Sequence, residues 1–283
     1  MRVHLHTVCW NDADDLEFFF RHYEPWVEKF FIHDDGSNDG SLDMLAARKD
    51  VVVEPLQRTN DESWVLSAKH IYDTSWRRSK GEADWVIVTN IDEHIRHPDM
   101  PGYLRRCAKA GVTAIPALGY QMVSEEIPET GSLLWRDYPM GAPWANMSKM
   151  QMFDPNQVGD CVFAPGRHKV AFSGRWVVPD RDEAINLHFK YMGKKEVFLR
   201  HQEQNERLGE VDRNRSWGHK YGWDWDEYEA DFEMFRAAAV DTTALDHHAA
   251  HREPRWWRDA EGARPKSRSL NRRFGRIGGW VWG

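Results

Sequence analysis

The sequence predicts an α/β fold in which a mostly parallel sheet is flanked by helices, and two observations carry that prediction. Short apolar runs that suit buried strands alternate with longer stretches in which apolar residues recur at three- and four-residue spacing. Polar and glycine-rich segments separate these elements. Strands that alternate with helices usually pair in parallel through right-handed crossovers, so we expect their carboxyl ends to meet at one edge of the sheet.

The composition of the chain excludes several classes of protein. A length of 283 residues allows one elaborate domain, and a formal net charge of -7 argues against a surface that binds nucleic acid over its whole extent. Cys9, Cys107 and Cys161 are widely spaced, so they indicate neither a disulfide framework nor a zinc knuckle and favour a reducing compartment. The first apolar run is too short and too rich in histidine for a signal peptide, and no run approaches a membrane span. We therefore expect a cytoplasmic protein.

The pattern places the elements as follows. We expect strands over residues 2–9, 30–32, 51–53, 85–89, 112–116, 169–172 and 185–187, and helices over residues 62–79, 101–110, 196–207 and 223–239. A further helix follows the first strand, with an apolar face that runs from Leu16 to Phe30. Residues 119–166 are rich in Gly, Pro, Trp and Met without clear periodicity, which predicts long functional loops.

Two of the predicted strands end in acidic residues. The strand at 85–89 runs into Asn90 and Asp92, and the strand at 30–32 is followed by Asp34 and Asp35 in a glycine-rich turn. Carboxylates at the carboxyl end of a buried strand can hold a hard divalent cation, and an acceptor-only carboxylate can accept the N–H of a nucleobase or a ribose hydroxyl. The plainer interpretation is a pair of polar turns that cap the elements after them.

Four motifs in the first hundred residues resemble a family 2-type glycosyltransferase of the GT-A fold, especially the branch related to family 92. Residues 10–12 stand where that branch begins with Lys-Asn-Glu, and His22 matches a histidine late in the first helix. The DDGSNDGS turn at 34–41 resembles the nucleotide-binding turn, and residues 85–93 resemble the metal strand. The family usually has an acid where this chain has Asn90, and an amide is a poorer metal ligand than a carboxylate.

The resemblance implies that the chain moves a sugar from a nucleoside diphosphate sugar, with a UDP-sugar favoured, to an acceptor hydroxyl. It implies that Asp92 and His188 bind Mn²⁺ or Mg²⁺, and that metal and lysines stabilise the departing diphosphate. The nucleotide-sugar contacts that it implies come from Thr7, Asn11, Asp34, Asp35, Asn90, Lys190, Lys194 and Lys195.

A base is also needed if the reaction inverts the anomeric carbon. Glu125 and Glu126 are the first candidates because they follow an apolar run that could be a strand pointing at the metal, and Asp137 is a third. The plainer interpretation of each is a solvated surface acid.

We expect a catalytic domain over residues 1–200, with a nucleotide and metal half over 1–97 and an acceptor half over 98–200. A helical extension over 201–250 and a basic, Trp-rich tail over 251–283 follow. Arginine interleaved with tryptophan suits peripheral contact with the inner face of a membrane and a carbohydrate or lipid-linked acceptor, although a basic terminus packed on an acidic body explains it equally.

Two other functions fit the same pattern. A nucleotidyltransferase would use a similar sheet and metal strand but would bind a nucleoside triphosphate, and no glycine-rich phosphate loop is visible near the N-terminus. A degenerate, non-catalytic nucleotide-binding module is the other alternative, and Asn90 makes it plausible.

Overall fold

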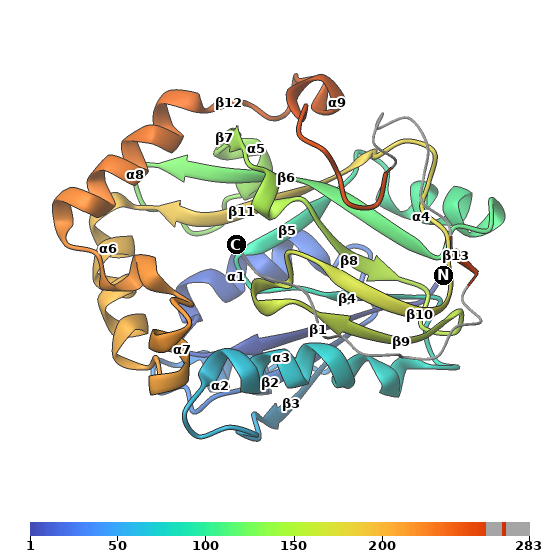
Figure 1. Cartoon of the computed structure of the whole chain (residues 1–283), viewed down its shortest axis with the longest axis horizontal. Coiled ribbons are helices and arrows are strands. Elements are labelled where there is room, and N and C mark those ends of the chain that lie inside the picture. Colours follow the sequence, from blue (N-terminus) through green and yellow to red (C-terminus); the bar gives the residue numbers. More distant parts are fainter. Residues whose placement is uncertain (259–267, 270–283) are drawn as a thin grey trace.

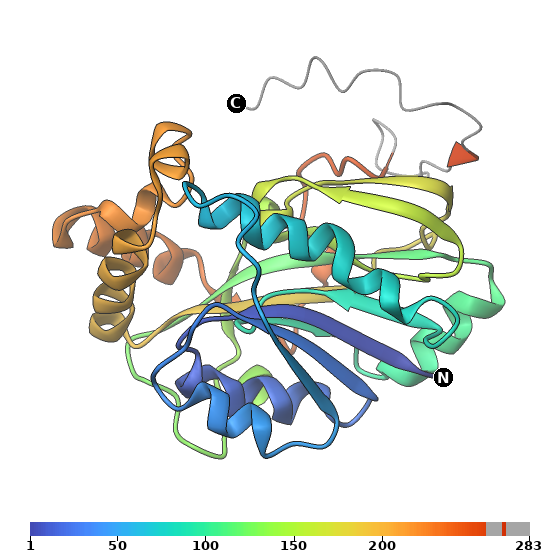
Figure 2. The same ribbon diagram turned by 90° about the horizontal axis from the view of Figure 1, so that it is seen from below.

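The computed structural model describes residues 1–258 and 268–269. Within them, a 10-stranded mixed sheet carries helices on both faces, and a 3-stranded sheet lies beside it (Figure 1). Figure 2 shows that the helices after the first two strands cover one face, while the helix after the third strand lies on the other face with part of the small sheet. This arrangement confirms the predicted α/β class.

The strands are β1 (Val3–Cys9), β2 (Lys29–Asp34), β3 (Val51–Pro55), β4 (Trp85–Val88), β5 (Glu93–Arg96), β6 (Ala114–Ser124), β7 (Met140–Pro143), β8 (Lys149–Phe153), β9 (Val158–Phe163), β10 (Val170–Trp176), β11 (Ala184–Met192), β12 (Val240–Asp241) and β13 (Arg268–Ser269).

The α-helices are α1 (Ala13–Tyr23), α2 (Ser41–Ala46), α3 (Trp64–Thr74), α4 (Met100–Lys109), α5 (Leu134–Asp137), α6 (Lys194–Glu206), α7 (Glu210–Asn214), α8 (Trp225–Ala238) and α9 (His247–Ala250). Short 3₁₀ helices are η1 (Ser75–Ser79), η2 (Ala145–Met147), η3 (Pro165–Arg167) and η4 (His219–Gly222).

The parallel part of the sheet has the order β4-β1-β2-β3, as the alternation of strands and helices predicts. Every residue of β1 and β4 is buried, because helices or the small sheet cover both faces of these strands. The carboxyl ends of β1 and β4 consequently open at the same edge of the sheet.

The second half of the sheet is mixed. β8 runs antiparallel to β4 and β6, and β7 runs antiparallel to β6. β11, late in the sequence, lies between two earlier strands, parallel to β6 and antiparallel to β5. This insertion places the second half of β11 beside the loop that follows β4.

The expectation of long loops over residues 119–166 is wrong, since the segment contains most of β6 together with β7, β8 and β9. All five residues of β8 are buried, so its side chains do not alternate between apolar and polar and show no strand period. Gly119 marks a close backbone approach, because a Cβ there would lie 2.0 Å from the carbonyl carbon of Met147.

Two predicted helices end earlier than their apolar spacing indicates. α1 stops at Tyr23, and Val27 and Phe30 continue the same core from the turn and from β2. The helix expected over 62–79 becomes the 3₁₀ helix η1 from Ser75 onward. Apolar periodicity reports which residues face the core, and it persists beyond the helix when the next segment packs on the same side.

The helices α6 and α8 pack against the ends of β6, β7 and β11, at the left of Figure 1. Tyr191 on β11 meets Tyr228, Phe232 and Phe235 of α8. These contacts join α8 to the strand that carries His188.

The first residues of the predicted tail pack on the body. Trp257 and Arg258 are 1% exposed, and Arg255, Trp257 and Arg258 all bond to the buried carboxylate of Asp182. The rest of the predicted tail, residues 259–267 and 270–283, lies outside the described residues. Within 1–258 and 268–269, no helix has the length and apolar character needed to cross a bilayer.

Candidate functional site

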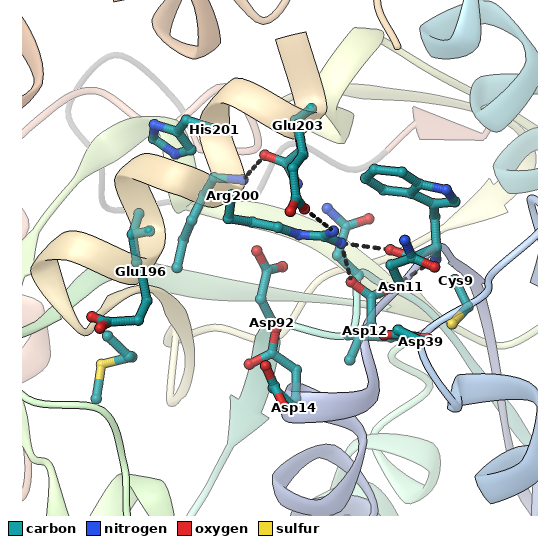
Figure 3. Close-up of a pocket in the computed structure, with 18 of the residues that line it drawn as sticks. Cys9, Asn11, Asp12, Asp14, Asp39, Asp92, Glu196, Arg200, His201 and Glu203 are labelled. Carbon is teal, nitrogen blue, oxygen red and sulfur yellow. Dashed lines mark hydrogen bonds and ion pairs between the residues drawn. The ribbon is translucent and has the colours of Figure 1, made fainter. Parts of the chain in front are cut away.

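A cavity of about 640 Å³ opens where β1 and β4 end and is closed on its far side by α6 (Figure 3). Its lining comes from the end of β1, the turn into α1, the loop after β4, the second half of β11 and one face of α6. Ligands of open α/β sheets collect at this edge because the strand ends leave a crevice there. The cavity therefore lies where the strand-end acids predict a site.

Asp92 and His188 meet beside this cavity. The Nε2 atom of His188 lies 3.2 Å from Oδ2 of Asp92. The register of the sheet brings them together, since His188 on β11 stands opposite Glu93 on β5 and the backbone N–H of Phe189 donates to the carbonyl of Asp92 at 2.7 Å. The two residues that the resemblance assigns to the metal are thus adjacent.

Gln121 on β6 fixes the tautomer of His188. Its amide group donates to the carbonyls of Met122 and His188, so Oε1 faces Nδ1 of His188 at 2.7 Å and accepts its proton. A neutral imidazole held in this way has its lone pair on Nε2, which faces the Asp92 carboxylate. Nε2 of His188 and Oδ2 of Asp92 are then two hydrogen-bond acceptors that face each other, and a proton or a metal ion between them stabilises this arrangement.

Burial raises the pKa of Asp92, but the charges of His188, Lys190 and Lys149 outweigh that effect and hold the pKa well below its ordinary value. Its Oδ1 atom is buried and has no hydrogen-bond partner among the described residues. A carboxylate that stays ionised and keeps an oxygen free is suited to bind a cation.

Glu93 completes the only group of three metal-type side chains in the described part of the chain, with one ligand atom from each of Asp92, Glu93 and His188 within 4.8 Å of the others. Its Oε1, however, is bonded by Lys149 at 2.8 Å and by Arg167 at 2.6 Å. Burial raises the pKa of Glu93, and these two cations lower it to about 2. Asp92 and His188 therefore fit a divalent cation, whereas the charge of Glu93 is already neutralised.

Asn90 belongs to the same buried network. Its Oδ1 accepts from the Tyr72 hydroxyl at 2.8 Å and from Arg167 at 2.7 Å. The guanidinium of Arg167 also lies 4.4 Å from the Tyr72 ring centroid. The amide at this position orients Arg167 toward Glu93 and is not free to serve as a metal ligand.

Acidic side chains and a positively charged arginine lie close together in the cavity wall. Figure 3 shows Arg200 of α6 reaching over Asp92 to Asp12, and the Arg200 to Asp12 distance is 3.2 Å. Burial raises the pKa of Asp12 to about 6, and burial with the charges of Asp12 and Asp92 raises that of Asp15 to about 8. This excess of carboxyl groups suits a bound cation.

Of the residues predicted to contact a nucleotide sugar, Asn11, Asn90 and Lys190 line the cavity. Lys190 donates to Gln204 and Tyr221, and although burial lowers its pKa, Tyr221 and Asp92 hold the pKa above its ordinary value. The ammonium thus stays charged in the cavity wall.

The other predicted nucleotide contacts are not part of the cavity lining. Thr7 is fully buried within β1, and Asp34 caps its own turn by accepting from the N–H groups of Gly36 and Ser37. Asp34 is the last residue of β2, and β1 separates β2 from β4, so Asp34 and Asp92 do not lie at the ends of neighbouring strands. Asp35 is bonded by two arginines, Arg58 and Arg207.

The remaining predicted side chains are outside the cavity lining. Lys194 pairs with Glu229 and Glu233 on α8, and Lys195 is exposed. The base candidates are all exposed or partly exposed surface acids: Glu125 pairs with Arg236, Asp137 pairs with Arg136, and Glu126 is exposed.

Sequence reasoning missed the residues that hold and complete the site: Gln121, Lys149, Arg167, Arg200, Arg207 and Asp15. Most of them lie on segments whose position depends on long-range pairing. Asp15 is the exception, since it stands in the first turn of α1 directly after the β1 strand end, where the rule that ligands gather at strand ends applies.

The sequence matches no family model and no curated protein. Solved structures with a similar arrangement include S. aureus TarS 1-349, at 10% identity and a TM-score of 0.39 over 74% of this chain and 69% of that chain. A second TarS 1-349 structure, in complex with UDP, gives 10% identity and a TM-score of 0.35 over 82% and 70%.

A third similar structure is glucosyl-3-phosphoglycerate synthase from Mycobacterium tuberculosis in complex with Mn²⁺, UDP and glucosyl-3-phosphoglycerate. It gives 14% identity and a TM-score of 0.29 over 42% of this chain and 44% of that chain. Identities and TM-scores this low assign neither family nor activity.

Proposed function

We propose that this protein transfers a glycosyl group from a nucleoside diphosphate sugar to an acceptor hydroxyl. The observation that carries the proposal is the Asp92 and His188 pair, 3.2 Å apart at the strand-end edge of the sheet, with Gln121 directing the free His188 nitrogen at the carboxylate. The pair lies beside a cavity large enough for a small-molecule ligand.

Asp92 and His188 would hold Mn²⁺ or Mg²⁺, which supplies Lewis-acid stabilisation of a diphosphate leaving group when bound. Imidazole with carboxylate suits Mn²⁺ somewhat better than Mg²⁺. Lys190 and Arg200 present fixed positive charge to the same cavity, and fixed charge is most effective where negative charge develops as the anomeric bond breaks.

The acceptor hydroxyl must lose a proton as it attacks. Asp15 lines the cavity, and its carboxyl group makes no hydrogen bond or ion pair within the described residues, so we assign it as the proton acceptor in place of Glu125, Glu126 and Asp137. A carbohydrate or lipid-linked acceptor would reach it from the open side of the cavity.

Thermal melting tests the proposal directly. UDP, GDP, dTDP and CDP are each added with and without Mn²⁺ to the wild-type chain, to Asp92→Asn and to the matched control Asp160→Asn, whose carboxylate pairs with Arg77 outside the cavity. We expect one diphosphate at 100 times its Kd to raise the stability of the wild type and the control by about 2.7 kcal/mol, and only with Mn²⁺. No shift in the wild type with any pair would contradict the proposal.

A non-catalytic nucleotide-binding module is the second candidate, because the oxygen of Asn90 is engaged by Tyr72 and Arg167. The same melting screen separates the two functions. A shift that is equally large without Mn²⁺ and in Asp92→Asn, together with no release of nucleoside diphosphate from a matching sugar donor, favours the binding module.

A further inference from the structure

One end of the cavity is lined by aromatic rings and an arginine. Trp10, Trp64 and Arg207 all contribute to the lining there. The guanidinium carbon of Arg207 lies 3.6 Å from the Trp10 ring centroid and 5.4 Å from that of Trp64. A planar, delocalised cation therefore lies against two indole rings.

The same guanidinium donates to a buried carboxylate. Its Nη2 bonds to Oδ2 of Asp35, whose side chain is only 7% exposed. Arg58 also bonds both oxygens of Asp35, at 3.2 and 2.7 Å, and does not line the cavity. Removing Arg207 would thus leave Oδ2 with a free lone pair while Asp35 remained paired with Arg58.

Trp64 has an unmet hydrogen bond at this place. Its Nε1–H is buried and finds no acceptor among residues 1–258 and 268–269. A buried donor without a partner is costly, and a ligand carbonyl would satisfy it. The site thus offers a stacking surface, a carboxylate acceptor and an indole donor.

We propose that the Arg207 guanidinium occupies the slot for a nucleobase, formed by Trp10, Trp64 and Asp35, and that the base of the donor nucleotide must displace it. The inference deepens the proposed function and depends on it. A flat ring that stacks on indole and donates an N–H to Asp35 repeats the contacts that Arg207 makes. A base with an N–H beside a carbonyl, such as uracil, thymine or guanine, also supplies an acceptor for Trp64.

Displacement requires only the side chain of Arg207 to rotate. The backbone that follows it is anchored, because a Cβ on Gly209 would lie 2.0 Å from the carbonyl oxygen of Glu62 and Asp212 accepts from the N–H of Trp64 at 2.9 Å. Burial lowers the pKa of Arg207 to about 10, against the attraction of Asp35, so the guanidinium loses hydration where it lies. Exposure to solvent on release offsets part of the lost contacts.

Calorimetric titration with UDP and CDP in the presence of Mn²⁺ tests the proposal on the full-length wild type, Arg207→Ala, Arg207→Gln and Arg58→Ala. Arg58→Ala is the matched control, because it removes a bond to the same carboxylate without touching either tryptophan. We expect both Arg207 variants to bind UDP about tenfold more tightly than the wild type, since binding no longer breaks a cation–π contact. Arg58→Ala should bind no more tightly than the wild type, and CDP, which lacks the imide N–H, should bind at least tenfold more weakly than UDP.

Equal or weaker UDP binding by both Arg207 variants would overturn the proposal and show that the arginine supports the nucleotide, while leaving the proposed function intact. If the Arg207 variants bind CDP as tightly as UDP, the assignment of the imide N–H of the base to Asp35 is wrong. If UDP, CDP, GDP and dTDP all show no binding to the wild type or to either Arg207 variant, and circular dichroism shows that these proteins are folded, the proposed function fails together with this inference.

Discussion

Glu93 and Asp92 are adjacent acids with different expected roles, and Glu93→Gln separates them. Glu93 is fully buried and accepts from Lys149 and Arg167, each only 2% exposed. The substitution removes the negative charge and leaves two cations in a dry interior. Breaking a buried ion pair on one side costs about 3 to 5 kcal/mol. At roughly 2 to 4 °C per kcal/mol for a chain of about this size, we expect Tm to fall by about 10 °C.

The assay is thermal unfolding followed by circular dichroism, with urea denaturation at 25 °C to give the free energy of unfolding. Asp92→Asn is the control, because that side chain is 20% exposed and contacts the ionisable His188 rather than a fixed cation. We expect its free energy of unfolding to change by less than about 1 kcal/mol while its response to Mn²⁺ disappears. A Tm for Glu93→Gln within 2 °C of the wild type, or a larger loss in Asp92→Asn, would refute the division of roles.

Three further predictions concern the supports of the site. Gln121→Leu should weaken Mn²⁺ binding by about 10- to 100-fold in calorimetry, because His188 loses the acceptor that fixes its tautomer; unchanged affinity would contradict this. His201 is buried without a partner for either ring nitrogen in the described chain, and burial lowers its pKa to about 2. Below pH 6.5 the unfolded state therefore binds a proton that the folded state does not, so the free energy of unfolding decreases as the pH is lowered. His201→Phe should reduce this dependence by about 1.4 kcal/mol per pH unit, measured by urea unfolding at about pH 4 to 6. Gly209→Ala should lower the free energy of unfolding by about 2 kcal/mol, because its Cβ meets the Glu62 carbonyl oxygen at 2.0 Å; a neutral result in the same assay would show that the loop moves freely.

The parallel half of the fold could be predicted because each of its signals is local. The apolar runs of β1, β2 and β4 and the apolar faces of the helices are read within ten or twenty residues. The rule that parallel strands end together then places Asp92 at the open edge without any coordinates. His188 came from the family resemblance, and its position opposite Glu93 depends on how β11 enters the sheet.

The surroundings of this pair could not be read in the same way. Gln121 and Lys149 lie on β6 and β8, which are buried on both faces and have no period to detect, and Arg167 is the one buried residue of the short helix η3. A buried lysine or arginine looks like any surface charge in a sequence until its partner is known. The base candidates failed to reach the cavity for the related reason that exposed acids after a strand are common.

The insertion of β11 has a consequence for synthesis of the chain. The ribosome synthesises β5 and β6 long before residues 184–192, so these two strands lack the strand that pairs with both of them until β11 has been made. Because the late strand carries His188, the pair with Asp92 forms only after residues 184–192 have joined the sheet. Cation affinity would then report completion of the fold, and a probe that senses Mn²⁺ would distinguish finished molecules from arrested ones.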